Sequence, residues 1–461
     1  MRFAPLAAMV AALSPQAFAL DASGAAAAAD FSNQQLAATA ARLSVQSSPS
    51  TTRADGTWQT VANTDLPGWT QGFFPGASWY AYALTGDPGA KTRADQWTRA
   101  LEAQKTNTTT HDLGFKLLSS FGRAWESTGD PYYKGVLLTA AASLASRYDP
   151  TIGAVICCDW NPDWHRPVVV DTMMNLELLL WGAKNGGPQA WRDMAVSHAM
   201  KTLADMVRPD GGTFHVVDYS TSGAILWRGT LQGVSDSSTW TRGQAWAIYG
   251  YTMLYRYTAD PRMLAAARKV TDFYLARLGS DPIPTWDFDA AAQHKDSSAA
   301  AAVAAALLEL SGFVADPDRQ RYLDAALGMI DTLASSAYLA KGTAAQSILL
   351  HGVGNLPAGA AVDAGLIYGD YYFLEALVRF REMSANAPQP DGGPPVEPDG
   401  GSPPPPADAG SGSGNPVGGA GASDTPAVRG AGGCASGSDA AFASFAILLL
   451  AVLRSRAVKR S

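Results

Sequence analysis

Cysteine is scarce in this 461-residue sequence, which contains only three. Cys157 and Cys158 are adjacent, where a disulfide would be strained, and Cys434 lies far away in the C-terminal tail. These positions exclude a disulfide framework. The chain must therefore rest on a large hydrophobic core, and it is long enough to form one.

Charged residues are also few, at 16% of the chain, and the formal net charge is −7. A chain without a basic stripe gives no support for nucleic-acid binding, so we expect no nucleic-acid partner. Aromatic residues, by contrast, are plentiful, with 13 Trp and 16 Tyr. Their apolar bodies and polar handles suit the packing of a core and the covering of sugar faces, and core packing alone would account for most of them.

No apolar run near the N-terminus is long enough to span a bilayer. The run at residues 4–13 follows a basic start at Arg2 and precedes the small-residue signature Ala17-Phe18-Ala19. This order is typical of a secretory signal peptide, which we predict for residues 1–19. A buried N-terminal helix is the alternative, and the cleavage signature disfavours it.

The C-terminal part of the chain lacks the large apolar side chains of a folded domain. Residues 388–433 are mainly Pro, Gly, Ser and Asp, so we predict a disordered linker. Residues 434–461 contain Cys434, an apolar run and a basic end, a stop-transfer pattern that resembles a MYXO-CTERM-type sorting segment. That resemblance implies an exported protein at the cell surface or outer membrane, with Cys434 processed or lipid-bearing. A plain short anchor is the alternative, and in both cases only the tail contacts the membrane.

The remaining residues, 22–387, repeat a helix–turn–helix unit. Asp87, Asp130, Asp260 and Asp316 each stand before a proline, between two stretches with helical apolar spacing. Because Asp is a favoured N-cap and Pro is favoured at the first helical position, each pair predicts the start of a helix. About twelve helices follow, and those rich in Gly, Ala and aromatic residues are predicted to be the inner ones: 74–85, 113–128, 172–184, 242–258, 296–314 and 370–384.

Helical hairpins of this kind cannot bury their apolar faces alone, so they must stack into an open solenoid or a closed ring. An open solenoid needs polar caps, and neither end of the repeat looks like one. We therefore predict one all-α catalytic domain, an (α/α)6 barrel, which is a toroid of six hairpins.

Polar residues gather just before the inner helices, which run in the same direction in such a ring and so open on one mouth. Helix N-termini attract anions, so this mouth suits an anionic ligand. Asp171 follows three valines and precedes two methionines after Thr172, and desolvation together with a second carboxylate would raise its pKa, as a general acid requires. Asp112 is the candidate second carboxylate of a coupled pair. A simple N-cap is the alternative role for either residue.

Several motifs of residues 67–379 together resemble the unsaturated glucuronyl hydrolases, glycoside hydrolase family 88. They are HDLGF at 111–115, DTMMN at 171–175, RPDG at 208–211, TFH at 213–215, QG at 232–233, STWTRGQAW at 238–246, WDFD at 286–289 and YGDYY at 368–372. The resemblance implies an (α/α)6 barrel that uses no metal or other cofactor. The implied substrate is an oligosaccharide whose non-reducing end carries the 4,5-unsaturated uronic acid left by a polysaccharide lyase.

The same resemblance implies a role for each matching residue. Asp171 matches the general acid/base, which protonates carbon 4 of the enol ether and activates water for carbon 5, and Asp112 matches the second catalytic aspartate. Arg242 is the first choice to bind the substrate carboxylate, with His215 behind it. A structural ion pair is the alternative for Arg242, and a satisfied polar residue is the alternative for His215. The further implied substrate contacts are Gln232, Trp246 and, as a stacking residue at the rim, Trp69.

Two segments limit this interpretation. Residues 157–165 contain Cys, Asp and His, but the adjacent cysteines cannot converge on one ion, so we predict no metal site and a rim loop that supplies Trp160 or Trp164. Residues 351–368 contain no Ser, Thr, Lys or Arg, so nothing there would recognise a sulfate. The alternatives are an unsaturated rhamnogalacturonyl hydrolase, an inverting glycosidase on the same fold, and a surface glycan-binding protein without turnover.

Overall fold

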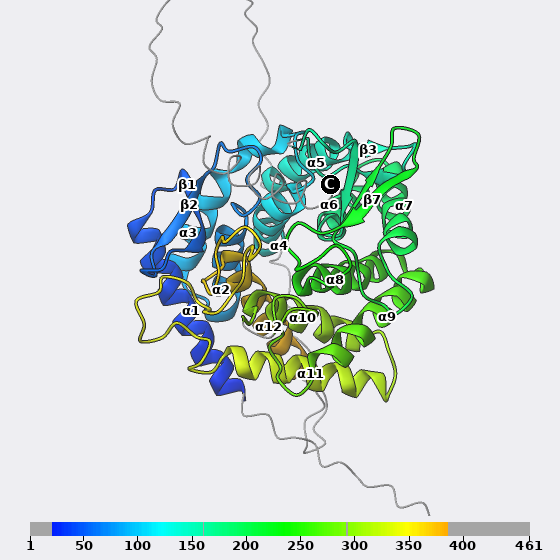
Figure 1. Cartoon of the computed structure of the whole chain (residues 1–461). Coiled ribbons are helices and arrows are strands. Elements are labelled where there is room, and N and C mark those ends of the chain that lie inside the picture. The colour runs from blue at the N-terminus through cyan, green and yellow to red at the C-terminus, as the bar shows by residue number, and fades with distance from the viewer. Residues whose placement is uncertain (1–20, 160, 292–293, 386–461) are drawn as a thin grey trace, which may run out of the picture. The chain divides into compact units, whose positions relative to one another are not determined.

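The computed structural model describes residues 21–159, 161–291 and 294–385, and these form a ring of helices (Figure 1). The predicted signal peptide at 1–19, linker at 388–433 and sorting segment at 434–461 lie outside the described residues and stay predictions. No helix of the described ranges is both long and apolar enough to cross a bilayer.

The inner wall of the ring contains α2 (Phe73–Thr85), η2 (Gly114–Gly122) continued by α4 (Arg123–Thr128), α6 (Thr172–Lys184), α8 (Thr241–Thr258), α10 (Ser297–Ser311) and α12 (Ile367–Ala385). Each inner helix packs against the next, and α12 returns to α2, so the ring is closed. The outer wall contains α1 (Ala22–Arg42), α3 (Pro88–Arg99), α5 (Pro131–Ala145), α7 (Ala190–Asp205), α9 (Pro261–Leu278) and α11 (Asp318–Leu333), and a short 3-10 turn, η1 (Glu102–Thr106), precedes η2. The predicted (α/α)6 barrel is confirmed.

Asp-Pro pairs begin three of the outer helices as the sequence predicts. The carboxylates of Asp87, Asp130 and Asp260 accept the backbone N–H two residues on, which satisfies one of the unpaired donors of the first turn. The prediction is wrong at α11, where Pro317 occupies the capping position and the helix begins at Asp318. Proline has no side-chain oxygen, so this helix starts without a side-chain cap.

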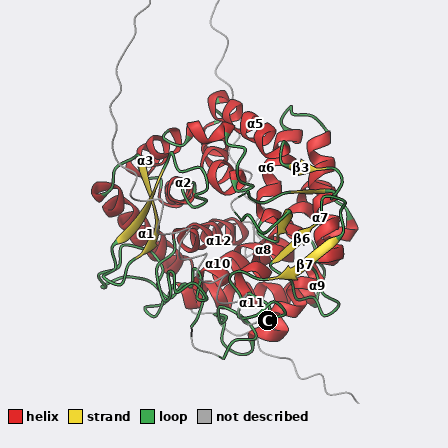
Figure 2. Cartoon of the chain, turned by 45° about the horizontal axis from the view of Figure 1, so that its top comes forward, coloured by secondary structure: helices red, strands yellow, loops and turns green. Residues whose placement is uncertain are grey.

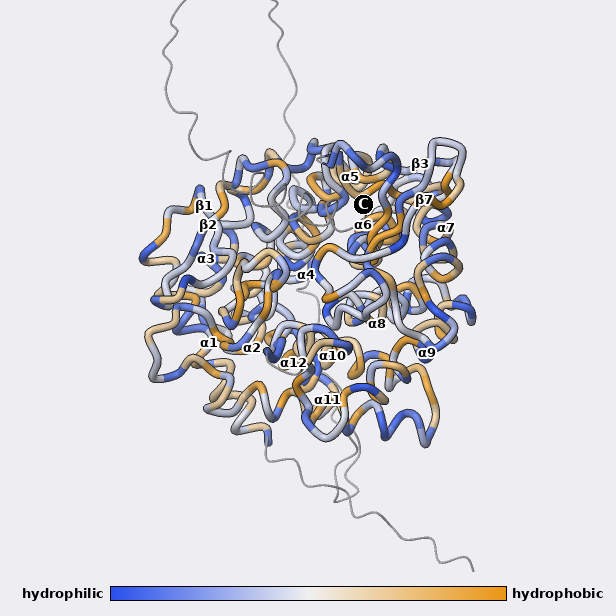
Figure 3. The backbone as a smooth tube through the Cα atoms, in the orientation of Figure 1, coloured by the Kyte–Doolittle hydropathy of each residue, from blue (hydrophilic) through white to orange (hydrophobic). Residues whose placement is uncertain are grey.

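Burial differs between the two walls in the way that composition predicts. Every residue from Ala299 to Ala306 in α10 is buried, because alanine lets helices approach from all sides. The outer helix α9 buries a stripe instead, with Met263, Ala266, Ala267 and Val270 on its inner face. Figure 3 shows the corresponding mixture of hydrophilic and hydrophobic residues along α9 and α11.

The connections between the helices contain short antiparallel sheets (Figure 2). The strand β1 (Ser47–Thr52) pairs with β2 (Trp58–Ala62), and β3 (Tyr148–Asp149) pairs with β4 (Ala154–Val155). A third sheet contains β5 (Arg166–Val169), β6 (Val216–Tyr219) and β7 (Ile225–Gly229), in that order. The third sheet matters most, because it joins the segment before Asp171 to the hairpin that begins after His215.

Asp370 holds one mouth loop to the inner wall. It lies in the first turn of α12 and is buried, and its two carboxylate oxygens accept the backbone N–H groups of Ile348 at 3.0 Å and Leu349 at 2.8 Å. We expect Asp370→Ala to lower the free energy of unfolding by about 1–3 kcal/mol for each buried donor left unpaired. Thermal unfolding checks this against Asp370→Asn, which keeps one acceptor and should lose less. Equal stability of all three proteins would contradict it.

Candidate active site

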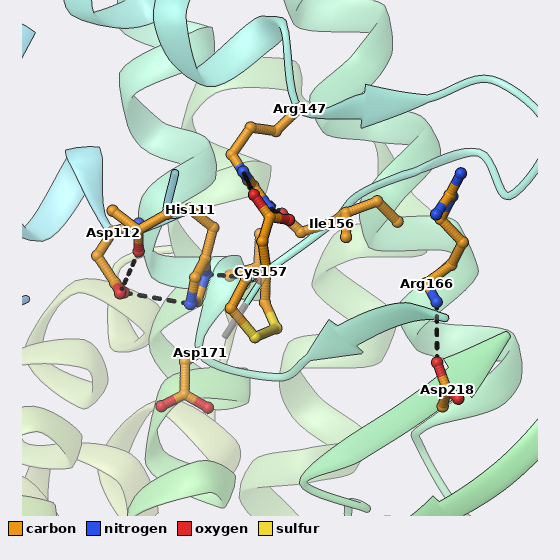
Figure 4. The surroundings of a disulfide bond; sticks show 12 residues. His111, Asp112, Arg147, Ile156, Cys157, Arg166, Asp171 and Asp218 are labelled. Atoms are coloured by element: carbon orange, nitrogen blue, oxygen red, sulfur yellow. Dashed lines mark hydrogen bonds and ion pairs between the residues drawn. A yellow bond between two sulfur atoms is a disulfide. The ribbon is translucent and has the colours of Figure 1, made fainter. Parts of the chain in front are cut away.

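The two predicted catalytic aspartates come from neighbouring inner helices. Asp171 is the N-cap residue of α6, and Asp112 lies two residues before η2, a π-helical segment of a kind that is often found at functional sites. These helices pack against each other, and Figure 4 shows the carboxylates of Asp112 and Asp171 on either side of the His111 imidazole. The structure therefore brings both aspartates to one place.

Asn175 ties the two helix starts together. Its side-chain N–H group points toward Asp112 Oδ1 at 3.5 Å and the backbone oxygen of Asp171 at 3.3 Å, while its Oδ1 accepts the Phe115 N–H at 2.8 Å. The approach requires a glycine at 114, because a Cβ there would lie 2.7 Å from the Asn175 Cα. Asn175 is thus a positioning residue for the pair.

Removal of Asn175 should loosen that geometry. We expect Asn175→Ala to lower kcat by about tenfold or more while KM changes little, since misplaced catalytic groups lose rate steeply. Steady-state kinetics on an unsaturated disaccharide provide the measurement. Asn185→Ala, at the other end of α6, is the matched control and should keep both parameters. A change in KM alone would assign Asn175 to substrate binding instead.

Asp171 faces a histidine of fixed tautomer. His215 Nε2 lies 3.4 Å from Asp171 Oδ2, and His215 Nδ1 accepts the Leu231 N–H at 3.3 Å, so the N–H of the ring that faces Asp171 is on Nε2. Stacking on Trp240, with ring centroids 4.4 Å apart, holds the imidazole in this orientation. Asp171 Oδ2 is buried, although the side chain as a whole is 17% exposed. Oδ1 is therefore the oxygen that a ligand can reach.

The electrostatic prediction for Asp171 is wrong. Burial acts to raise the pKa of the Asp171 carboxyl, but the close approach of His215 and the nearby His111 and Arg242 side chains outweigh it. The pKa therefore lies below its ordinary value, and the free enzyme holds Asp171 ionised at neutral pH. The valines and methionines around Asp171 indicated burial correctly, but they gave no sign of the two histidines and the arginine that folding brings beside it.

Asp112 has a different set of partners. Thr110 Oγ1 donates to its Oδ2 at 2.8 Å, and His111 Nε2 lies 3.3 Å from its Oδ1. The other His111 nitrogen lies 2.9 Å from Thr172 Oγ1 on α6. Burial lowers the pKa of His111, and Asp112 and Asp171 oppose the shift without reversing it, so His111 is neutral. His111 and Asn175 are site residues that we assigned no role from sequence, although both stand inside the quoted motifs.

Arg242 is buried, and both of its guanidinium Nη groups have partners inside the protein. Its guanidinium forms an ion pair with Asp296 at 2.9 Å, and its Nη2 donates to Gln232 Oε1 at 2.7 Å. It also donates to the backbone oxygens of Val353 and Gly354, and it is only 1% exposed. This is the geometry of the structural ion pair considered as the alternative. The predicted contact of Arg242 with a substrate carboxylate stays a prediction, while Gln232 is partly exposed beside it.

The two predicted tryptophans occupy different depths. Trp69 is partly buried, with its ring centroid 4.7 Å from that of Tyr368 and 5.4 Å from that of Phe115. Trp246 is completely buried beneath Phe115, at 5.5 Å. Trp69 is therefore placed to meet a ligand directly, whereas Trp246 supports the residues that could.

An internal cavity of about 20 Å³ lies further down the same helices, lined by Phe115, Met174, Tyr249, Tyr372 and neighbouring residues. It has room for one water molecule and not for a sugar ring. This cavity therefore does not accommodate a sugar.

Cys157 and Cys158, the adjacent cysteines of the sequence, form a disulfide beside this site (Figure 4). A bond between adjacent residues closes no long loop, and the fold still rests on its core. The Cys157 backbone oxygen accepts the His111 N–H at 2.9 Å, which ties this loop to the aspartates. No cluster of three or more His, Cys, Asp or Glu suited to a metal occurs among the described residues. Trp160 lies outside them.

Comparisons with known proteins agree with this fold. Residues 41–280 match the family described as Glycosyl Hydrolase Family 88. An unsaturated glucuronyl hydrolase of Formosa agariphila is 46% identical over 68% of this chain and 80% of its own length. An unsaturated glucuronyl hydrolase of a Bacillus species is 33% identical over 71% of this chain and 89% of its own length.

Solved structures give the same result. An unsaturated glucuronyl hydrolase specific for heparin is 39% identical, with a TM-score of 0.75 over 78% of this chain and 98% of that one. The Bacillus enzyme, responsible for the degradation of glycosaminoglycan, is 30% identical, with a TM-score of 0.72 over 78% and 97%. The closed helical ring with its acidic mouth therefore defines a glycoside hydrolase. The chain belongs to Glycosyl Hydrolase Family 88, and its activity is that of an unsaturated glucuronyl hydrolase.

Proposed function

We propose that Asp171 and Asp112 remove a 4,5-unsaturated uronic acid from the non-reducing end of lyase-generated oligosaccharides by hydration of its double bond. The observation that carries the proposal is the asymmetric setting of Asp171. Its buried Oδ2 faces the His215 Nε2–H, which leaves Oδ1 on the side that a sugar can approach. Oδ2 of Asp171 is thus held in place beside His215, and Oδ1 is the oxygen that gives and takes the proton.

The reaction needs a proton at carbon 4 and a hydroxide at carbon 5. The substrate's own carboxylate is a negative charge that raises the pKa of Asp171 on binding, so Asp171 takes up a proton there. Asp171 gives this proton to carbon 4, and its carboxylate then removes a proton from the water that attacks carbon 5. The resulting hemiketal opens, the glycosidic bond breaks, and one water has been added in total.

We assign Asp112 an indirect role, which is to favour the protonated form of Asp171. Held by Thr110 and linked through Asn175 to the start of α6, it places a second carboxyl group next to Asp171. Because two neighbouring carboxylates resist joint ionisation, Asp112 also favours protonation of Asp171 once the substrate is bound. The attack is not at the anomeric carbon, so the spacing rule for inverting and retaining pairs does not apply.

The substrate class is supported by the ligands of related structures. One contains dGlcA-Glc-Rha-Glc, and an enzyme of Streptococcus agalactiae contains dGlcA-GalNAc6S. The partner proposed for this chain is an unsaturated uronyl oligosaccharide. The loop at 351–368 has no Ser, Thr, Lys or Arg, which favours substrates without sulfate.

An absorbance assay on unsaturated disaccharides tests the reaction. Loss of the ultraviolet absorbance of the conjugated double bond supports hydration. Sugar release with the absorbance intact would instead indicate ordinary glycoside hydrolysis by an inverting pair. Binding without either change would indicate a glycan-binding protein, and a preference for unsaturated rhamnogalacturonyl substrates would move the specificity but not the chemistry.

We further propose that the enzyme is exported and held at the cell surface or outer membrane. The proposal is supported by the sequence alone, through the signal-peptide pattern at 1–19 and the linker and sorting-segment patterns at 388–461. Cell fractionation tests it, because activity should sediment with membranes. Activity confined to the cytoplasmic fraction would reject it.

A further inference from the structure

Two tryptophans form a small aromatic surface outside the catalytic pair. Trp164 and Trp227 stack with their ring centroids 6.0 Å apart and their planes 27° apart, and both are partly exposed. Behind them lies a buried apolar cluster of Cys157, Cys158, Val169 and Val216. We call this pair of rings the tryptophan platform. The proposed roles of the aspartates make no use of it.

The Trp227 ring is fixed in place before any ligand arrives. Its Nε1 donates to Asp236 Oδ2 at 3.3 Å. The ring lies over Gly229, because a Cβ at that position would come within 2.2 Å of Trp227 Cζ2. Since a fixed side chain loses little entropy on binding, the platform suits recognition better than a mobile tryptophan would.

The sheet places this ring next to the catalytic residues. Trp227 pairs with Asp218 across β6–β7, and Gly229, under the ring, pairs with Val216 and accepts the His215 N–H at 3.1 Å. His215 Nε2 in turn lies 3.4 Å from Asp171 Oδ2. The strand β7 leads on to Leu231, whose N–H bonds His215. One short hairpin therefore positions both the partner of Asp171 and Trp227, one of the two rings of the platform.

We infer that the tryptophan platform stacks against a sugar on the leaving-group side of the scissile bond, an inference that rests on the proposed function. Indole rings bind well where one surface of a ligand is apolar and its rim is polar, which describes a pyranose ring. The Asp236 carboxylate beside Trp227 disfavours a second anionic sugar there, so the occupant is a neutral sugar. Trp227 is thus a specificity-determining residue for the length of the leaving group.

The test compares two substrates that differ only on the leaving-group side. One is an unsaturated tetrasaccharide whose following sugars are neutral, and the other is the methyl glycoside of the unsaturated uronic acid, which has no second sugar. For Trp227→Ala we expect KM to rise about 3- to 10-fold with the tetrasaccharide, on the scale of one lost aromatic contact, and to stay unchanged with the methyl glycoside. Trp227→Phe, which keeps an aromatic face, should recover most of the loss.

Leu226→Ala is the matched control, because Leu226 is the neighbour of Trp227 in β7 and is 51% exposed. It should behave as wild type on both substrates. An equal rise in KM on both substrates for Trp227→Ala would show a packing role and overturn the inference, as would no change with the tetrasaccharide. A wild-type enzyme that leaves the double bond of both substrates intact would instead refute the proposed function, so the two failures are distinct.

Discussion

Replacement of Asp171 by Asn should lower kcat on an unsaturated disaccharide by about 10²- to 10⁴-fold, the usual contribution of a positioned general acid. The asparagine amide has nearly the same shape, so it still meets His215 Nε2 through its oxygen, but it has no proton of suitable acidity for carbon 4. Decay of the ultraviolet absorbance of the substrate measures the effect directly. The thermal unfolding temperature should stay close to that of the wild type.

The control for this variant is Asp193→Asn, which changes an exposed carboxylate on the outer helix α7 and should leave turnover intact. Near-normal absorbance loss by Asp171→Asn would refute its assignment as the acid. Sugar release by this variant with the double bond retained would place the chemistry at the anomeric carbon.

We expect a change of pH to alter kcat/KM by about as much as the substitution of Asp171 alters kcat. Because the pKa of Asp171 in the free enzyme lies below its ordinary value, only a small fraction of the enzyme carries the required proton near neutrality. That fraction falls tenfold for each unit of pH above the pKa, so we expect kcat/KM to fall by about tenfold per unit between pH 5 and 7. The sign follows from the role, since an acid acts in its protonated form and loses activity as pH rises.

The pH profile of kcat should be flatter over the same interval. It reports the enzyme–substrate complex, in which the substrate carboxylate raises the pKa of Asp171 and restores the proton. Initial rates measured over a range of substrate concentrations at each pH, at constant ionic strength, separate the profile of kcat from that of kcat/KM. Thermal unfolding at each pH checks that the enzyme stays folded. If kcat/KM rises with pH from 5 to 7, the ionised form of Asp171 in the free enzyme is the active form. Asp171 would then act first as a base, which would contradict the proposed order of steps.

Much of the fold was predictable because it is encoded locally. Asp87, Asp130 and Asp260 cap their helices through contacts within two residues, and the apolar spacing of the inner segments gave five of the six inner helices as single elements. The sixth divides at Gly122 into a π-helical part and an α-helix, which depends on how η2 packs against α2 and α6. No local sequence pattern predicts this change from π-helix to α-helix.

The sequence predicted that Asp112 and Asp171 lie at one site, but it gave no role to His111 or Asn175 and no sign of the electrostatics. The motifs around Asp112 and Asp171 identified the aspartates, but the charge state of Asp171 depends on His215 and Arg242, which are 44 and 71 residues further along the chain. Arg242 shows the same limit, because its ion pair with Asp296 and its bonds to Val353 and Gly354 are contacts that only ring closure creates.

The sequence by itself determined that this chain forms a ring of helical hairpins, and its motifs identified the enzyme family and the two acidic residues. Those properties follow from spacing, capping and residue identity, which act over a few residues. Only the tertiary structure decided which aspartate oxygen is exposed, which cations set its pKa, and that Trp227 lies over Gly229 beside His215. These features arise from contacts between segments that are far apart in the chain. Such contacts produce no regular spacing of residues, so they cannot be predicted from the sequence pattern.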